Sequence, residues 1–301
     1  MPAEPPSLCP LSKLGVLEVA GADAQTFLND QLSQELAALP AARAPLAAWH
    51  DARGRVQGLF RVLRAGTGWL LLTHREAVPA IVERLTIYVL RSDVRLRDVT
   101  AQWRAAALLG GGEGWVDAYG LDPGNRPGDS VRRADVIWIR VGPSLLHLLA
   151  PPEAFGELEA ELARGGEAAA DLAEIRLGLP ELAPVLLGRF TPHMLNLDLL
   201  GALSFDKGCY PGQEVIARTQ NLGAVKRRML RFSAETRRLP SVGSRILDGT
   251  GAQVAELVRI APTQNGVDLL AVTQLDAAHS ALVSEEDPEV ELRREPLAYR
   301  I

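Results

Sequence analysis

The sequence changes character near Lys226, and this change constrains the fold more than any other feature. Before it, strand-like runs alternate with amphipathic, helix-like runs; after it, only strand-like runs follow, with polar turns between them. Short strands at even spacing are typical of a small β-barrel or sandwich. We therefore expect an α+β region over residues 1–225 and a separate β-barrel over residues 226–301.

The strand and helix alternation is clearest near the start. Leu14 to Gly21 has the pattern of a strand, and a helix with Asp23 as its N-cap is expected to follow. A hairpin with its turn at Ala65 to Gly68 comes next, before a helix that begins with Thr73 and Glu76 at capping-box spacing. This order of elements is typical of an α+β unit.

The middle of the chain has a looser version of the same pattern. Two strands flank the Gly142-Pro143 pair, and an amphipathic helix follows them. We expect this helix to end at Gly165-Gly166, because glycine favours helix termination.

Composition and charge disfavour several classes of function. The 301 residues, 47% of them hydrophobic, suffice for two or three packed units. A net charge of -5 gives no general reason for direct binding to nucleic acid or to an anionic membrane. No run approaches the roughly 20 apolar residues that span a bilayer, and the N-terminus lacks a secretory pattern, so we expect a cytoplasmic protein.

One segment just before the expected boundary concentrates reactive and charged side chains. Residues 207–214 read Lys-Gly-Cys-Tyr-Pro-Gly-Gln-Glu. Lys207 would favour the thiolate of Cys209 if the two side chains converge. The other cysteine is Cys9, so neither a disulfide framework nor a cysteine metal site is expected, and the scattered histidines predict no metal site either.

The side chains around this thiol suit a polar heterocyclic ligand with an acidic tail. Tyr210 offers a flat face and a hydroxyl, and Gln213 and Glu214 offer an amide and a carboxylate. An alternative interpretation is a buried cysteine among solvated surface charges. The candidates for neutralising a carboxylate tail are Arg218, Lys226, Arg227 and Arg228.

The run "KGCYPGQEVIAR" resembles the signature of the YgfZ-type folate-binding proteins, relatives of the aminomethyltransferase (T-protein) of the glycine cleavage system. "LEVAGADAQTFLNDQLSQEL", "LAAWHDARGRVQGLFRVLR", "RLGLPEL" and "TPHMLNLDLLGALSFDKGCY" are also similar to segments of this family. The resemblance covers nearly the whole chain. It implies an α+β fold of the GcvT/YgfZ type, with a ring of two ferredoxin-like α+β units and a C-terminal β-barrel around a central folate pocket.

The resemblance also implies a function. Members bind tetrahydrofolate, or a one-carbon derivative of it, and support iron-sulfur cluster assembly or repair in client enzymes, including tRNA-modifying enzymes. The implied partners are therefore a folate and iron-sulfur client or assembly proteins. Lys207 and Cys209 are the implied functional pair, with Tyr210, Gln213 and Glu214 shaping their loop. Clusters normally need several thiolate ligands, so any contact of Cys209 with a cluster would be transient or shared with a partner.

Two places differ from the family pattern. A glutamate that relatives often carry falls at Arg176 here, and Glu174 lies two residues earlier. Some members also have tryptophan at the pocket wall, near the places of Leu14 and Ala170. Trp49 is the nearest substitute, and the alternative interpretation of Trp49 is a hairpin aromatic buried in the core.

Three other functions remain open on sequence grounds. A folate-dependent aminomethyltransferase resembles this chain but has paired aspartates where Gly58 and Leu59 stand, and its chemistry needs a positioned acid or base. The expected role is therefore non-catalytic. The second alternative is a thiol-redox module built on Cys209. The third is a scaffold that has kept the fold and lost the ligand.

Overall fold

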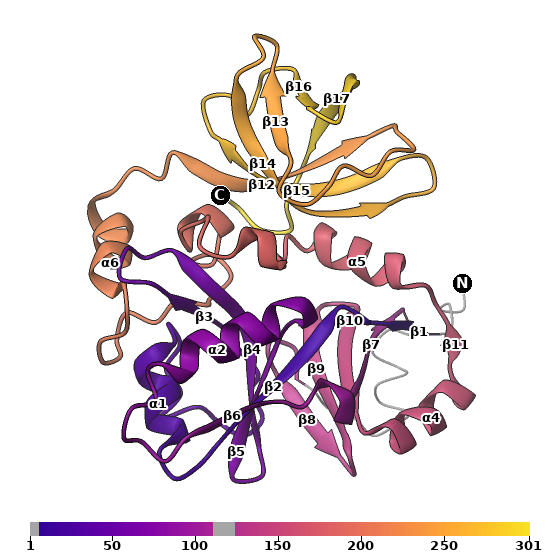
Figure 1. The fold of residues 1–301 in the computed structure, drawn as a ribbon. Helices are drawn as coiled ribbons and strands as arrows, with labels where there is room; N and C mark the ends of the chain where they lie inside the picture. The colour runs from indigo at the N-terminus through magenta and orange to yellow at the C-terminus, as the bar shows by residue number, and fades with distance from the viewer. Residues whose placement is uncertain (1–5, 111–123) are drawn as a thin grey trace.

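The computed structural model describes residues 6–110 and 124–301. Two α+β units lie side by side below a β-barrel, and helix α5 (Glu167–Arg176) runs between the barrel and the two sheets (Figure 1). This architecture confirms the fold class expected from the sequence.

The first unit contains a five-stranded antiparallel sheet in the order β3-β4-β5-β2-β6. Phe60 of β4 packs in the core formed with two helices, whereas Leu59 belongs to the cluster on the other face. Side chains alternate along a strand, so Arg61 also belongs to this second face. The hairpin turn at Ala65 to Gly68 is confirmed. The elements are β2 (Leu14–Ala20), α1 (Ala24–Gln31), β3 (Leu46–His50), β4 (Val56–Ala65), β5 (Gly68–His74), η1 (Arg75–Ala77), α2 (Val78–Thr86) and β6 (Arg95–Asp98).

The second unit contains a six-stranded sheet in the order β11-β1-β7-β10-β9-β8. Strand β1 lies between β7 and the short β11 in this sheet. The N-terminal segment therefore belongs to the second unit, although the first unit follows it in the sequence. The elements are β1 (Ser7–Pro10), η2 (Thr100–Gln102), β7 (Arg104–Leu109), β8 (Ser130–Arg133), β9 (Val136–Gly142), β10 (Leu145–Ala150), α4 (Pro152–Glu161), β11 (Ala163–Arg164) and α5.

Six strands close into the C-terminal barrel, in the order β12-β15-β14-β13-β16-β17. Pairing of β12 with β17 completes the closure, which leaves no open sheet edge. Phe232, Leu257 and Leu269 belong to the apolar cluster of the barrel. The strands are β12 (Arg227–Ala234), β13 (Arg245–Asp248), β14 (Gln253–Pro262), β15 (Val267–Gln274), β16 (Leu282–Ser284) and β17 (Asp287–Glu295).

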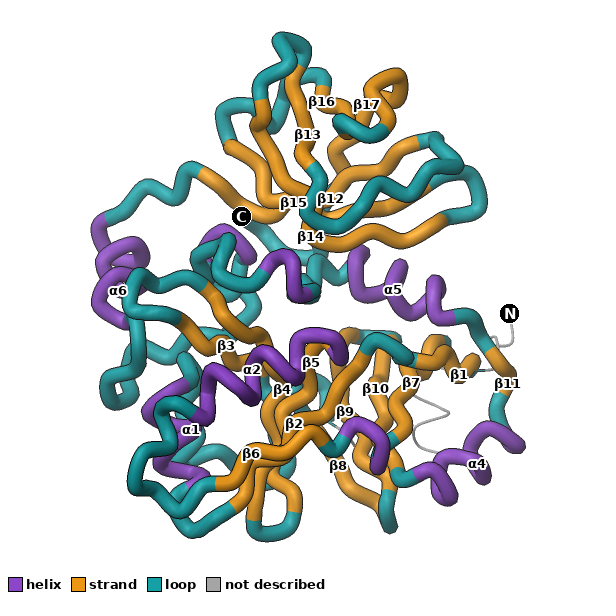
Figure 2. The backbone as a smooth tube through the Cα atoms, in the orientation of Figure 1, coloured by secondary structure: helices purple, strands orange, loops and turns teal. Residues whose placement is uncertain are grey.

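One apolar cluster joins the three parts around α5. It contains Leu59 of β4, Ile175 of α5, and Val258 and Leu270 of the barrel. The chain between α5 and α6 (Gln213–Leu222) is mostly loop (Figure 2). It contains two short 3₁₀ helices, η3 (Pro184–Leu186) and η4 (His193–Leu195). This loop-rich segment leads to the thiol motif.

One local expectation was confirmed in position only, and two were wrong. Asp23 is the N-cap residue of α1 as expected, but its side chain makes no capping hydrogen bond, because its carboxylate accepts from the backbone N–H of Asp93. Thr73 lies within β5, and η1 separates it from α2, so no capping box forms. Helix α4 ends at Glu161, before the glycine pair, because residues 163–164 pair with β1 as β11.

Among the described residues, none of the helices has the length and apolar character needed to cross a bilayer.

Candidate functional site

Helix α5 presents three acidic side chains to a central cavity where both units and the barrel meet. Glu167, Asp171 and Glu174 stand at positions i, i+4 and i+7, which lie on one face of a helix. All three line the cavity, together with Arg61 of β4 and Arg259 of β14. The cavity therefore combines carboxylates from one helix with cations from the sheet and the barrel.

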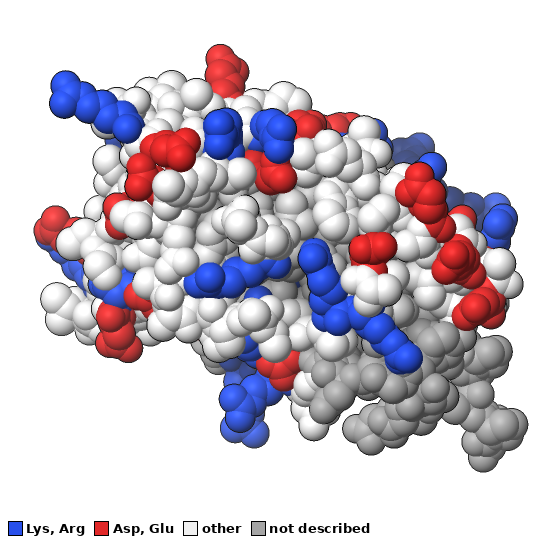
Figure 3. Space-filling model, turned by 90° about the horizontal axis from the view of Figure 1, so that it is seen from below, with Lys and Arg blue, Asp and Glu red and all other residues white. Residues whose placement is uncertain are grey.

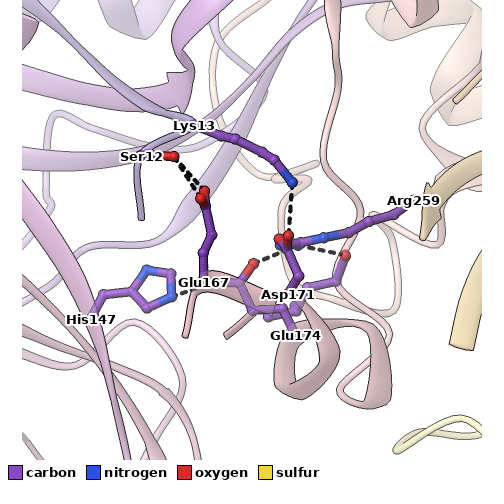
Figure 4. A network of polar contacts seen from close by, with 8 residues as sticks. Ser12, Lys13, His147, Glu167, Asp171, Glu174 and Arg259 are labelled. Carbon is purple, nitrogen blue, oxygen red and sulfur yellow. Dashed lines mark hydrogen bonds and ion pairs between the residues drawn. The ribbon is translucent and has the colours of Figure 1, made fainter. Parts of the chain in front are cut away.

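Arg259 holds two of these carboxylates (Figure 4). A bulge interrupts the strand register between Leu257 and Arg259, and bulges redirect side chains. The Arg259 guanidinium donates from Nη2 to Oδ1 of Asp171 at 2.7 Å, and its Nη1 lies 2.5 Å from Oε2 of Glu174. The side chain is buried, so these ion pairs connect the barrel to α5 away from bulk water.

Two further side chains complete the polar network. Nε2 of His147 lies 2.5 Å from Oε1 of Glu174, and Lys13 donates to Oδ2 of Asp171 at 2.7 Å. Burial alone would raise the pKa of Glu174, but Arg259 and then His147 hold it well below its ordinary value. Glu174 is therefore ionised, and a carboxylate has more acceptor positions than these partners occupy. The network offers fixed hydrogen-bond acceptors to a ligand.

Arg176, at the place of the family's usual glutamate, lies apart from this network. Its side chain is half-exposed and pairs with Asp268 of the barrel at 3.3 Å. Glu174, two residues earlier, lines the cavity instead. A carboxylate from α5 is thus present at the cavity despite the change at position 176.

Lys207 anchors the thiol loop to the first unit. Its ammonium donates to the backbone carbonyls of Leu32 at 2.7 Å and Gln34 at 2.9 Å, and also to that of Asn29. These bonds match the three donors of an ammonium group. Burial lowers the pKa of Lys207 to about 8, and Cys209 lies exposed on the surface. The geometry therefore shows Lys207 as an anchor of the loop, with its donors directed at the backbone.

Tyr210 fixes the underside of the same loop. It is buried, and its ring centroid lies 5.9 Å from that of His50. Burial raises the pKa of Tyr210 to about 12. Burial, and then the nearby His193, lower the pKa of His50 to about 3, so this imidazole is neutral. The loop thus has a packed inner side and an exposed thiol on its outer side.

Helix α6 begins directly after the loop. Gly212 adopts φ +77°, and a Cβ there would lie 2.5 Å from the backbone oxygen of Asp51, so only glycine permits this close approach. Gln213 and Glu214 form the first turn and line a surface pocket that also includes Cys209. The exposed side chain of Arg218 pairs with Glu214 at 3.4 Å.

The remaining residues predicted from the sequence lie elsewhere. Arg228 donates to Asp198 at 2.6 and 2.9 Å, Arg227 begins β12, and Lys226 is exposed just before it. Trp49 packs in the core of the first unit, edge-on to Tyr88. None of these four predicted residues lines the central cavity.

The central network itself was not found from the sequence. The acidic face of α5 was a usable signal, because three carboxylates recur at helical spacing in "EAAADLAEIR". No such signal marked the partners of these carboxylates, which are Lys13, His147 and Arg259. They are far apart in the sequence, and only the folded chain brings them close together.

Comparisons with known proteins agree with the fold and the family expected from the sequence. No family model matches the chain. An uncharacterized protein of Haemophilus influenzae is 30% identical over 240 residues, covering 78% of this chain and 76% of that protein. The tRNA-modifying protein YgfZ of Edwardsiella ictaluri is 29% identical over 301 residues, covering 94% of this chain and 89% of that protein. The chain belongs to the YgfZ family.

One solved structure matches the fold of this YgfZ-family chain. The glycine cleavage system aminomethyltransferase T from Bartonella henselae matches with a TM-score of 0.73 and 16% identity, covering 96% of this chain and 84% of that one. At this identity the match shows a shared fold. The YgfZ-family chain is thus built on the aminomethyltransferase architecture.

Proposed function

We propose that this YgfZ-family protein binds tetrahydrofolate, or a one-carbon derivative of it, in the central cavity. We further propose that it supports iron-sulfur cluster assembly or repair in client enzymes, including tRNA-modifying enzymes. In this proposal residues 1–225 form the folate-binding region, and the barrel of residues 226–301 completes the cavity through Arg259. The observation that carries the folate proposal is the cavity beside α5, with its fixed carboxylates and apolar walls.

The residues present fit such a ligand chemically. A reduced pterin carries several N–H donors beside a carbonyl acceptor, and Asp171 and Glu174 are fixed acceptors for such donors. Leu14, Leu59 and Leu182 supply apolar contacts for the ring faces. A bound tetrahydrofolate would supply a carrier of one-carbon units. These side chains would bind and orient it and exclude water from its ring.

Cys209 would serve a different step from folate binding. It is exposed on the anchored loop, and it lines the surface pocket at α6, apart from the residues of the central cavity. An exposed thiol on a fixed loop is accessible to a protein partner. One thiolate is too few to hold a cluster, so the client or assembly protein would supply the other ligands.

The alternatives have less support. The aminomethyltransferase would need an acid or base where Gly58 and Leu59 stand, and Asp171 and Glu174 of α5 are already ion-paired with Arg259. A disulfide switch between the two cysteines has no support, because Cys9 is fully buried in the second unit. Burial also raises the pKa of the Cys9 thiol. These features favour a non-catalytic, folate-binding role.

The surface charge supports protein clients over direct tRNA binding. The face drawn in Figure 3 has Lys and Arg side chains both at its centre and at its edges, with Asp and Glu side chains interspersed among them. A protein that binds RNA through its backbone presents a basic surface. Mixed charge, together with the net charge of -5, favours action on the modifying enzymes themselves.

The thiol role is tested in cells that lack this protein. We expect the wild type to restore the activity of an iron-sulfur tRNA-modifying enzyme, measured as the content of its modified nucleoside. Cys209→Ala should restore no more than the empty vector, because the exposed thiol is lost. Cys9→Ala is the matched control and should restore activity fully. Equal rescue by Cys209→Ala and the wild type would remove the proposed thiol role.

A further inference from the structure

Arg61 is a buried cation whose neighbours across the sheet are apolar. It lies on the inner face of the first sheet, where Leu46 of β3 and Leu72 of β5 are its register partners. Its residue exposure is 8%. Burial, as the dominant cause, lowers the pKa of Arg61 to about 10. The side chain is thus a positive charge held away from bulk water.

Arg61 has few direct partners for such a position. Nη1 donates to the backbone oxygen of Ala44 at 2.9 Å, and within residues 6–110 and 124–301 no carboxylate lies within ion-pair distance of it. Arg259, also buried, has two carboxylate partners. Glu174 attracts Arg61 from across the central cavity without a direct ion pair, and a buried charge that lacks a direct counterion is unfavourable. Arg61 therefore has donors to spare for an anionic group.

Two cavities meet at Arg61. It lines the central cavity and also a neighbouring cavity of about 520 Å³, and Leu46, Val141 and Leu179 line both as well. In the part of the chain that the structure describes, the charged residues of this second cavity are Arg43 and Arg61, with no carboxylate among them. The two cavities thus differ in charge on either side of a shared wall.

This difference would orient a ligand that carries N–H donors at one end and a carboxylate at the other. The acids of α5 attract the donors and repel the carboxylate. The second cavity has the opposite preference, because it offers guanidinium groups and apolar walls that include Leu177 and Leu199. A guanidinium can hold a carboxylate through two parallel hydrogen bonds.

We infer that Arg61 receives a carboxylate of the folate's glutamate tail, which passes from the central cavity into the second cavity. The inference rests on the proposed function, because it assumes that the pterin ring lies beside α5. Arg43 adds positive charge to the same cavity, although its own guanidinium pairs with Asp129. The tail site is thus distinct from Lys226 and Arg228, the tail contacts expected from the sequence.

Calorimetric titration of Arg61→Met separates this inference from the proposed function. Two probes are used: tetrahydrofolate, and 6-methyltetrahydropterin, which has the ring without the tail. We expect Arg61→Met to weaken tetrahydrofolate binding by about tenfold or more, since a charge-assisted contact is lost, and to leave the tail-less probe unchanged. Arg61→Lys keeps the charge, so its affinity for tetrahydrofolate should lie between those of the wild type and Arg61→Met. Arg64→Met, an exposed arginine on the same strand, is the matched control and should bind both probes as the wild type does.

Each other outcome has a definite meaning. Unchanged tetrahydrofolate binding by Arg61→Met, or equal weakening of both probes, overturns the tail site and leaves the proposed folate binding intact. Equal affinity of the wild type for both probes also overturns the tail site and leaves the proposed folate binding intact. Failure of the wild type to bind either probe overturns both proposals. Thermal unfolding of each variant confirms that it is folded. If Arg61→Met does not fold, Arg61→Lys replaces it in the test. Tetrahydrofolate binding by Arg61→Lys with the same affinity as the wild type then overturns the tail site.

Discussion

Replacing Arg259 by methionine is expected to lower the free energy of unfolding by about 3–5 kcal/mol, because it leaves two buried carboxylates short of their counterion. Asp171 keeps Lys13 and Glu174 keeps His147, but the two ion pairs that Arg259 makes from the barrel to α5 are lost. Methionine is unbranched and fills the vacated volume, so a cavity adds little to the loss. Denaturant unfolding followed by circular dichroism measures the change.

The matched control is Arg293→Met, also in the barrel. Arg293 pairs with Glu235 at 3.0 Å, but both side chains are more than 70% exposed, and exposed ion pairs contribute little. We expect its unfolding curve to coincide with that of the wild type. Arg259→Met as stable as the wild type would show that the network is not what holds the barrel on α5.

The loss of unfolding free energy on replacing Arg259 should become smaller as the pH falls. The folded pKa of Glu174 lies below its ordinary value of 4.5, so this group stabilises the fold above pH 4.5, and its contribution is lost as the pH falls further. Removing Arg259 removes the main attraction that lowers this pKa. The stability difference between wild type and variant should therefore shrink below pH 4.5.

Replacing Lys207 by methionine is expected to release the thiol loop. Three backbone carbonyls of the first unit lose their donor, and an unsatisfied buried acceptor costs about 1–3 kcal/mol. Lys207 is partly exposed, so water can replace some of these bonds, and we expect a local cost of about 2 kcal/mol. Amide hydrogen exchange over residues 204–212 should then become about tenfold faster or more.

Lys226→Met is the control for this change, because Lys226 is an exposed lysine close in sequence that does not line either cavity. Its exchange rates over residues 204–212 should equal those of the wild type. Unchanged exchange in Lys207→Met would show that the loop is held by Tyr210 and Gly212 without the ammonium.

Periodicity in the sequence was enough to predict the main architecture. The all-strand region after Lys226 forms the barrel, and the hairpin at Ala65 to Gly68 forms as expected. The sheet to which β1 belongs was not predictable in this way, because a strand of four residues shows no pattern that identifies its neighbouring strands. Its pairing with β7 and β11 is set by the rest of the second unit.

The candidate site was less accessible from the sequence. The motif showed the thiol loop, but the acceptors for Lys207 are backbone oxygens, which any residue provides. The network on Asp171 and Glu174 needs partners from β10 and β14, and only the folded topology brings them together. Arg61 appeared to be an ordinary strand residue, because the sequence does not show which charges lack a partner.

The most direct test of folate binding beside α5 is a crystal structure of the protein grown with tetrahydrofolate. We expect electron density for the pterin ring between α5 and β4, with its N–H groups facing Asp171 and Glu174. Density for the ring at the surface pocket beside α6, or no ligand density from crystals grown at saturating tetrahydrofolate, would contradict the proposed site.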